Sequence, residues 1–412
     1  MTSQAAAPRE PRSMFRVVRQ REFGLYFTGG SLSSLGTWCH NIASGLIVYD
    51  LTGSTLLVGV VNFSQFVGSV LLAPAAGAAA DRWDRRRVLV VSQTAAAAIG
   101  AVLAIVVISG MVTAPIVIMA TLLLGLAMAF AVPSLMALVP LLVDEEDLDV
   151  AVALNSVMFN LARAVGPVLG AAVVEWAGYG TAFALNAASF VAFISLLLVV
   201  RPRPQRHHGN GRTRFIDSLR QVRANKRVAA LLIAVAAVSM STDPVQTLPP
   251  ELVRDVFEQR DLFVGFLVGS FGLGAVATAL ILVPRMQRRR RVLFWAMIVQ
   301  GTGMMIVGVA PTIEVAMMGM AISGGGFISA ITRSTARLHA EVDDSQRGRI
   351  MALWSLAFLG TRPVAALLDG VVAEVAGARS AAVVLALPVL VTAIFVNRML
   401  PPVVLPAQGD GD

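Results

Sequence analysis

Twelve long apolar runs, separated by short polar stretches, follow one another along this chain of 412 residues. A helix needs about 20 apolar residues to cross the roughly 30 Å hydrocarbon core of a membrane, and each run provides that length. The composition agrees, because 56% of the residues are hydrophobic and only 14% are charged. We therefore expect an all-α membrane protein with twelve transmembrane helices. The expected spans are 23–49, 54–79, 88–109, 114–142, 150–175, 179–200, 228–249, 262–284, 292–311, 313–337, 350–374 and 378–399.

The positive charges are distributed unevenly over the stretches between these spans. With the N-terminus in the cytoplasm, 27 of the 33 Lys and Arg residues fall on the cytoplasmic side, three on the outer side and three inside spans. Cytoplasmic loops of membrane proteins carry such an excess. The net charge of +8 therefore indicates topology rather than a nucleic-acid partner, and we expect both termini in the cytoplasm. The Ala-, Val- and Arg-rich composition, with Lys226 as the one lysine, indicates the plasma membrane of a high-GC bacterium.

Two segments of the chain, 199 positions apart, have matching sequences. Leu154–Gly178 and Leu353–Gly377 are identical at ten of 25 positions when they are aligned without gaps. A second match, at an offset of 206, relates the span around Gly59 to the span around Gly265. Internal repeats indicate duplicated structural units. We therefore expect two related six-helix bundles, an arrangement found in many secondary transporters.

Each matching segment carries an arginine in the middle of its apolar run, Arg163 in one and Arg362 in the other. An arginine at mid-membrane depth costs about 2.5–3.5 kcal/mol on insertion scales, so a duplicated one indicates a purpose. Arg333 lies in the cytoplasmic half of the tenth span. A purely structural role, in which Arg163 and Arg362 bind backbone carbonyls or acids, stays open. Glu175 and Glu374 lie at outer helix ends, where we expect solvation or gate contacts rather than proton transfer.

Three acidic side chains in or near the spans are candidate partners of the buried arginines: Asp50, Asp243 and Asp369. Asp243 is the preferred proton site, because the following Pro244 opens the helix locally. A carboxylate in such surroundings can exchange a proton near neutral pH. In the half-to-half correspondence, Asp243 falls opposite a polar cluster of the first span, Cys39, His40 and Asn41. His40 and Asn41, together with Arg333, are further candidates for the proton-coupling or cavity site. His40 is also open to a packing role. The aromatic residues that can line a large apolar cavity are Trp38, Phe63, Phe66, Phe159, Trp354 and Phe358.

The polar stretches between spans divide the chain into five parts. These are a cytoplasmic segment 1–21 with an interfacial helix at Met14–Glu22, a bundle 22–200, a cytoplasmic linker 201–227, a bundle 228–399 and a cytoplasmic tail 400–412. The adjacent His207 and His208 lie in the linker and are expected to be solvated rather than metal ligands. The single cysteine, Cys39, excludes an internal disulfide.

The connection between the second and third spans, Gly77–Val88, reads GAAADRWDRRRV. It resembles the loop signature of the major facilitator superfamily, G-x-x-x-(D/E)-R-x-G-R-(R/K). The resemblance extends over the whole chain and implies that superfamily's fold and transport by alternating access. It also implies a conformational latch between the acid of this motif, the loop arginines and the start of the eleventh helix at 345–349. The latch residues are Gly77, Asp81, Arg82 and Arg85. Asp84 stands where glycine is usual, and a purely topological role of the loop arginines stays open.

The fifth span contains Ala162–Gly170, ARAVGPVLG, which is similar to the G-x-x-x-G-P-x-x-G pattern of exporting members of the superfamily. The matching residues are Gly166, Pro167 and Gly170, and Ala162 replaces the first glycine. Small residues at this spacing allow close helix packing. A plain packing role is therefore open beside a hinge or seal. Val48–Ser54, with Gly348–Leu353 and Gly360–Pro363, resembles the macrolide-efflux and enterobactin-exporter branch of drug–proton antiporters.

The sequence has no nucleotide-binding loop of the G-x-x-x-x-G-K-(S/T) type, no catalytic constellation and no metal-ligand spacing. We therefore expect neither an enzyme nor a cofactor or metal. The expected partners are the lipid bilayer, a small-molecule substrate and protons, and the expected state is a monomer. The predicted function is proton-coupled export of a bulky apolar or amphiphilic compound, such as an antibiotic or secondary metabolite. A dedicated siderophore exporter, an importer and a non-transporting membrane receptor or scaffold are the alternatives.

Overall fold

The computed structural model describes residues 14–203, 225–281, 291–342 and 344–400, and these ranges contain helices and no strand. The side chains of Pro74, Ala80, Asp81 and 344–349 are not described. Most of the predicted linker and tail, residues 1–13, and His207 and His208 therefore lie outside the described residues. The predicted latch contact between Asp81 and 345–349 lies outside them as well.

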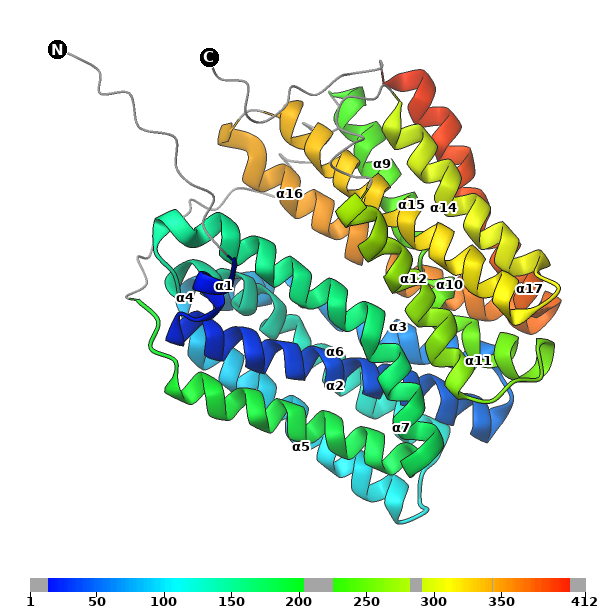
Figure 1. Ribbon diagram of the computed structural model, residues 1–412, viewed down its shortest axis with the longest axis horizontal. Coiled ribbons are helices and arrows are strands. Elements are labelled where there is room, and N and C mark those ends of the chain that lie inside the picture. The colour runs from blue at the N-terminus through cyan, green and yellow to red at the C-terminus, as the bar shows by residue number, and fades with distance from the viewer. Residues whose placement is uncertain (1–13, 204–224, 282–290, 343, 401–412) are drawn as a thin grey trace.

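The first half of the chain forms one bundle of helices (Figure 1). A short helix precedes it, and Val17 of that helix is buried against the bundle while Phe15 is exposed. The helices are α1 (Met14–Val18), α2 (Arg21–Thr52), α3 (Thr55–Leu71), α4 (Ala73–Arg82), α5 (Arg85–Ile108), α6 (Ala114–Leu138) and α7 (Leu148–Val199), with 3₁₀ turns at Val139–Leu141 and Glu145–Asp147.

The second half forms the other bundle. Its first helix is interrupted, so that several short segments follow one another before α12. The helices are α9 (Lys226–Met240), α10 (Pro244–Thr247), α11 (Pro249–Glu251), η3 (Leu252–Val256, a π-helix), α12 (Leu262–Ile281), α14 (Val292–Val309), α15 (Ile313–Ala340), α16 (Asp344–Leu359) and α17 (Arg362–Met399).

Eight helical segments of the described chain are long and apolar enough to cross a membrane. Two of them are bent, at Gly178 (φ 80°) in α7 and at Gly377 (φ 81°) in α17, so each crosses twice. Glycine adopts this left-handed backbone without steric cost, and the two glycines occupy equivalent positions of the repeat. With α2 and α3, which are more polar or shorter, the crossings number twelve. The predicted twelve-helix, two-bundle fold is confirmed.

The two bundles meet along two helix pairs, α7 with α12 and α3 with α17. At the first contact, a Cβ atom on Gly265 would lie 2.6 Å from the carbonyl oxygen of Pro167. At the second, a Cβ atom on Gly59 would lie 2.4 Å from the carbonyl oxygen of Ala366. Pro167 and Ala366 are equivalent in the repeat, as are Gly59 and Gly265. The duplication therefore extends to the close backbone contacts that hold the halves together.

Candidate functional site

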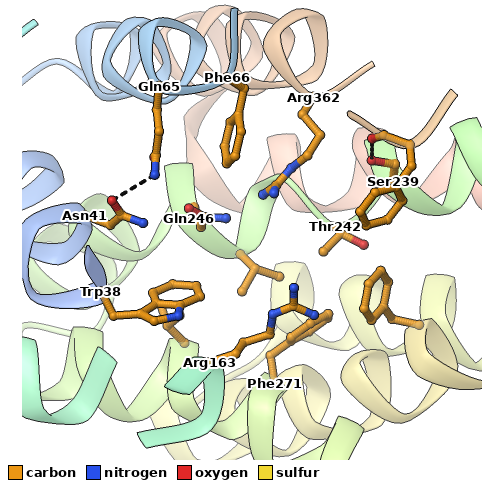
Figure 2. Close-up of a pocket in the computed structure, with 14 residues that line it drawn as sticks. Trp38, Asn41, Gln65, Phe66, Arg163, Ser239, Thr242, Gln246, Phe271 and Arg362 are labelled. Carbon is orange, nitrogen blue, oxygen red and sulfur yellow. Dashed lines mark hydrogen bonds between the residues drawn. The ribbon is translucent and has the colours of Figure 1, made fainter. Parts of the chain in front are cut away.

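A cavity of about 170 Å³ lies between the two bundles, and both bundles contribute to its wall (Figure 2). The polar lining residues are amides, hydroxyls and the two repeat-related arginines, and most of the apolar ones are aromatic. They are Trp38 and Asn41 of α2, Gln65 and Phe66 of α3, Arg163 of α7, Ser239, Thr242, Val245 and Gln246 around the interrupted helix, Val268 and Phe271 of α12, Phe327, Phe358 and Arg362. A wall of this kind suits a small molecule with an apolar body and polar groups.

Asp243 lies where the helix after α9 is interrupted. α9 ends at Met240, a turn follows, and α10 begins at Pro244, so the helix opens at the position that the proline predicts. The Asp243 side chain is fully buried. Its Oδ1 atom accepts hydrogen bonds from Nε and Nη2 of Arg362, both at 3.3 Å. Its Oδ2 atom has no hydrogen-bond partner among the described residues.

Arg362 and Arg163 both reach the cavity, from opposite walls, with their guanidinium groups pointing into the space between (Figure 2). Arg362 is paired with Asp243 and stacks on Phe66, with 3.8 Å from Cζ to the ring centroid. Arg163 lies over Phe327 at 5.5 Å. Among the described residues, no carboxylate forms an ion pair with Arg163. The structure therefore places the repeated arginines in one site, and within the described part of the chain only Arg362 has a counter-ion.

Asp369 of α17 is fully buried, and neither of its carboxyl oxygens has a hydrogen-bond partner among the described residues. It lies close enough to Asp243 for the two carboxyl groups to interact electrostatically. An ionised carboxylate without partners is costly to bury. Asp369 therefore belongs to the same buried polar interior as Asp243, and it is not among the described residues that line the cavity.

The other predicted cavity residues divide between two environments. Asn41 lines the cavity and accepts a hydrogen bond of 2.9 Å from Nε2 of Gln65. His40 is fully buried inside the first bundle, where its ring packs edge-on against Phe183 at 5.2 Å. Arg333 is half-buried on α15 and is not among the residues that line the cavity. Asn41 therefore lies in the cavity wall, whereas His40 and Arg333 are not among the residues that line it.

The small residues of the fifth span pack on two sides of α7. A Cβ atom on Gly166 would lie 2.6 Å from Cβ of Trp38, and one on Gly170 would lie 2.9 Å from Cα of Cys39. Gly166 and Gly170 therefore bring α7 close to α2 within the first bundle. Pro167 faces the other bundle, at the contact with Gly265.

The loop between α4 and α5 is held by its own side chains. Nη1 of Arg85 donates a hydrogen bond of 2.8 Å to the carbonyl oxygen of Ala137, which ties the loop to α6. Asp84 caps α5, since its Oδ1 atom accepts from the backbone N–H of Arg87 at 2.7 Å. The acid at the usual glycine position thus begins a helix. Arg82 is exposed, and a Cβ atom on Gly77 would meet none of the described atoms within 4 Å.

At the end of the bundles that carries Gly53, Gly178 and Gly377, here called the far end, polar side chains join the halves. Arg254 is central: it donates to Asp50 at 2.6 Å and to Asp261 at 2.7 and 2.8 Å. Its hydrogen bonds with Asp261 raise the pKa of the Arg254 guanidinium above its ordinary value, so the group stays charged. The Tyr179 hydroxyl donates to Asp50 at 2.9 Å, and Tyr49 donates to Asp255.

Glu175 and Glu374 contribute equivalent contacts at this end. Glu175 accepts from the backbone N–H of Leu262 at 2.8 Å, and Glu374 accepts from the backbone N–H of Leu56 at 3.3 Å. Each carboxylate thus binds the first turn of a helix of the opposite bundle, where the helix dipole favours negative charge. We refer to Asp50, Glu175, Tyr179, Arg254, Arg260, Asp261 and Glu374 as the far-end clamp.

Sequence reasoning missed several of these residues. Phe271, Phe327 and Gln246 of the cavity wall carried no motif, and Arg254 and Asp261 looked like loop charges. Of the six aromatic residues proposed for a cavity, Trp38, Phe66 and Phe358 line this one. Trp354 stacks on Phe358 at 5.2 Å instead. The equivalence of Glu175 and Glu374 was the one signal that pointed to the far-end contacts.

Twelve crossings in two repeat-related bundles around a central polar cavity define a secondary transporter of the major facilitator type. The sequence profile of one family, described as "Transmembrane secretion effector", matches residues 12–407. The chain belongs to this family of multi-pass membrane transporters within the major facilitator superfamily. The resemblance that the sequence motifs indicated is thereby confirmed.

Curated relatives match most of the chain. The staphyloferrin A transporter of Staphylococcus aureus is 24% identical and covers 91% of this chain and 96% of its own. Macrolide efflux protein A of Streptococcus pyogenes is 22% identical, and the match covers 86% of this chain and 89% of that protein. The enterobactin exporter EntS of Shigella boydii is 26% identical, and the match covers 79% of this chain and 78% of that protein. The crystal structure of nucleoside transporter NupG shares the fold, with a TM-score of 0.71, 14% identity, and coverage of 92% of this chain and 98% of that chain.

Proposed function

We propose that this protein is a proton-coupled exporter of a bulky amphiphilic compound, such as an antibiotic or secondary metabolite, in the bacterial plasma membrane. The observation that carries this proposal is the buried ion pair of Asp243 and Arg362 at the wall of the central cavity. A proton on Asp243 neutralises the carboxylate and releases the Arg362 guanidinium into the cavity. Protonation of Asp243 therefore changes the positive charge that the cavity presents to a substrate, and this couples proton binding to substrate binding.

Asp369 extends this proposed proton site. Its carboxyl group is buried beside Asp243 and has no hydrogen-bond partner among the described residues. Two negative charges that interact in a buried site repel each other. In our proposal the pair carries the exchanged proton, and Asp243 is the member that transmits the change to Arg362.

The distribution of positive charge also predicts which end of the transporter faces the outside. With both termini in the cytoplasm, as the excess of positive charge predicts, the far-end clamp lies on the outer side. In Figure 1 the two bundles converge at this end and diverge toward the side of α1 and the start of α16. We interpret this conformation as closed to the outside. Alternating access then requires the far-end clamp to break, while the proposed latch of Gly77, Asp81, Arg82 and Arg85 forms at the opposite end.

A dedicated siderophore exporter is the second candidate. It is favoured by the staphyloferrin A transporter, which matches 91% of this chain. Siderophores are bulky and polar, and the amide and hydroxyl groups of the cavity wall suit such a compound as well as they suit an amphiphile. The two candidates share the coupling mechanism and differ in the breadth of substrates.

The test is transport in proteoliposomes that contain the full chain and an imposed pH gradient. Macrolides, siderophores and other amphiphilic metabolites are loaded on the side that corresponds to the cytoplasm. We expect at least one class to move against its own gradient while protons move the opposite way, and we expect a protonophore to stop the flux. Transport that continues unchanged after the protonophore would contradict proton coupling. Transport of a single siderophore with no macrolide flux would select the second candidate.

A further inference from the structure

We propose that the exported substrate carries an acidic group, a carboxylate or an equivalent anion, and that the Arg163 guanidinium binds it. This inference rests on the proposed export function and specifies its substrate class. The observation behind it is that two repeat-related arginines face one cavity, and among the described residues only Arg362 is paired with a carboxylate.

The described residues of the cavity wall carry more positive than negative charge. Two guanidinium groups and no carboxylate are among the described residues that line the cavity. Asp243, just behind the wall, binds Arg362 through Oδ1 and so compensates that arginine alone. Within the described part of the chain the wall therefore keeps one uncompensated positive charge, on Arg163.

The sequence around Arg163 explains why the described residues of its own bundle provide no counter-ion. The first span has no Asp or Glu between Glu22 and Asp50, so α2 offers no equivalent of Asp243. At the position equivalent to Asp369, α7 has Gly170, which packs against the backbone of α2. A guanidinium at this depth needs an anionic partner or a wet cavity. A bound anion supplies the partner that the described residues do not provide.

The surroundings of Arg163 suit an anion attached to an apolar body. Its guanidinium lies 5.5 Å from the centroid of Phe327, and Phe271 and Trp38 line the same part of the cavity. The planar guanidinium presents paired N–H groups that match the two oxygens of a carboxylate. Gln246, whose Oε1 atom is buried without a partner among the described residues, adds a polar contact for a neighbouring hydroxyl or amide.

Binding to the purified full chain in lipid nanodiscs tests this inference directly. The probes are 1-naphthaleneacetate and 1-naphthaleneacetamide, which have nearly the same shape and differ in charge. We expect the anion to bind about tenfold more tightly or better, the gain from one charge-assisted hydrogen-bonded contact. Arg163→Gln should abolish this preference, and Arg163→Lys should retain part of it, since it keeps the charge. Arg398→Gln, which removes an exposed positive charge at the end of α17, is the matched control and should keep the full preference.

Three results would overturn the inference: equal binding of the two probes, undetectable binding of both, or an unchanged preference in a folded Arg163→Gln variant. Thermal unfolding of each variant establishes that it is folded, and Arg163→Lys provides the test if Arg163→Gln does not fold. Failure here is distinct from failure of the export proposal. Gradient-driven export of neutral or cationic compounds without anion preference refutes this inference alone. Absence of gradient-driven flux for every compound refutes the exporter, although the binding preference stays measurable.

Discussion

Arg163 and Arg362 occupy equivalent positions of two duplicated segments, yet they lie in different electrostatic environments. Arg362 is paired with the buried Asp243 and stacked on Phe66. Arg163 faces the same cavity with an aromatic ring beside it and, among the described residues, no carboxylate. Both halves thus carry the cation, and among the described residues the buried acids near it, Asp243 and Asp369, belong to the second half.

This difference shows how a repeat can divide two tasks between equivalent positions. The contacts that hold the bundles together stayed symmetric, as the matched approaches of Gly59 and Gly265 show. The polar interior became asymmetric, because Asp369 stands where α7 has Gly170. In our proposals the second half exchanges the proton and the first half presents a free cation to the substrate.

The largest expected effect is on stability, from removal of the paired arginine. Arg362→Gln leaves Asp243 buried without its counter-ion, which costs about 3–5 kcal/mol for a buried pair. Arg163→Gln breaks no ion pair among the described residues and should cost less than about 1 kcal/mol. Thermal unfolding in detergent or nanodiscs measures both. Adding Asp243→Asn to Arg362→Gln should recover part of the lost stability. Equal destabilisation by Arg362→Gln and Arg163→Gln would contradict the difference between the two arginines.

Next in size is the effect of Asp243→Asn on coupled flux. The variant keeps the shape of the side chain but removes the proton exchange, so gradient-driven efflux should fall by about 100-fold, within the usual range of coupling free energies. Counterflow exchange without a pH gradient should persist, which shows that the variant is folded and binds substrate. Gradient-driven efflux at the wild-type rate would remove Asp243 from the proposed mechanism.

A smaller effect should follow when the first half is given the acid that it lacks. Asn41→Asp places a carboxylate in the cavity wall and keeps the acceptor for Gln65. We expect the affinity for 1-naphthaleneacetate to fall by about tenfold, as for one added repulsive charge at moderate distance. The neutral amide should bind as before. Asn41→Leu is the uncharged control, and the same loss of anion affinity in that variant would point to shape rather than charge.

The smallest effects are expected at the far-end clamp. Glu175 accepts from Leu262 and also pairs with Arg260 at 3.1 Å, whereas Glu374 accepts from Leu56 and from the Ser54 hydroxyl at 2.9 Å. Such partly exposed contacts contribute about 0–1 kcal/mol each. Glu175→Gln should open the far end slightly more often than Glu374→Gln, because it also loses an ion pair.

Distances between spin labels measure that opening. Labels at Met111 and Thr312, both exposed in connections at the far end, report the separation of the two bundles once Cys39 has been replaced by alanine. We expect a longer-distance population that grows in the order wild type, Glu374→Gln, Glu175→Gln. The reverse order would show that the Arg260 pair does not hold the clamp closed.

Much of the fold and part of the site were predictable because they rest on local and repeated signals. Run length gave the twelve spans, and the match of Leu154–Gly178 with Leu353–Gly377 gave the two bundles and the paired arginines. Pro244 predicted the helix opening at Asp243. His40, in contrast, carried the same signal as Asn41, one residue away, yet it turns into the first bundle. Periodicity alone cannot say which face of a helix meets a cavity when every face is apolar.

The sequence by itself determined that this chain crosses the membrane twelve times as two related halves, because hydrocarbon accepts only long apolar helices and duplication leaves matching residues. Only the tertiary structure decided that Asp243 belongs to Arg362, that Arg163 has no acid beside it in the described part of the chain, and that Glu175 and Glu374 bind across the bundles. The physical reason is that the two kinds of interaction act over different separations along the sequence. Burial in lipid acts on each segment separately, whereas the counter-ion of Arg362 is assigned by a contact with a residue 119 positions away, which follows from how the helices pack.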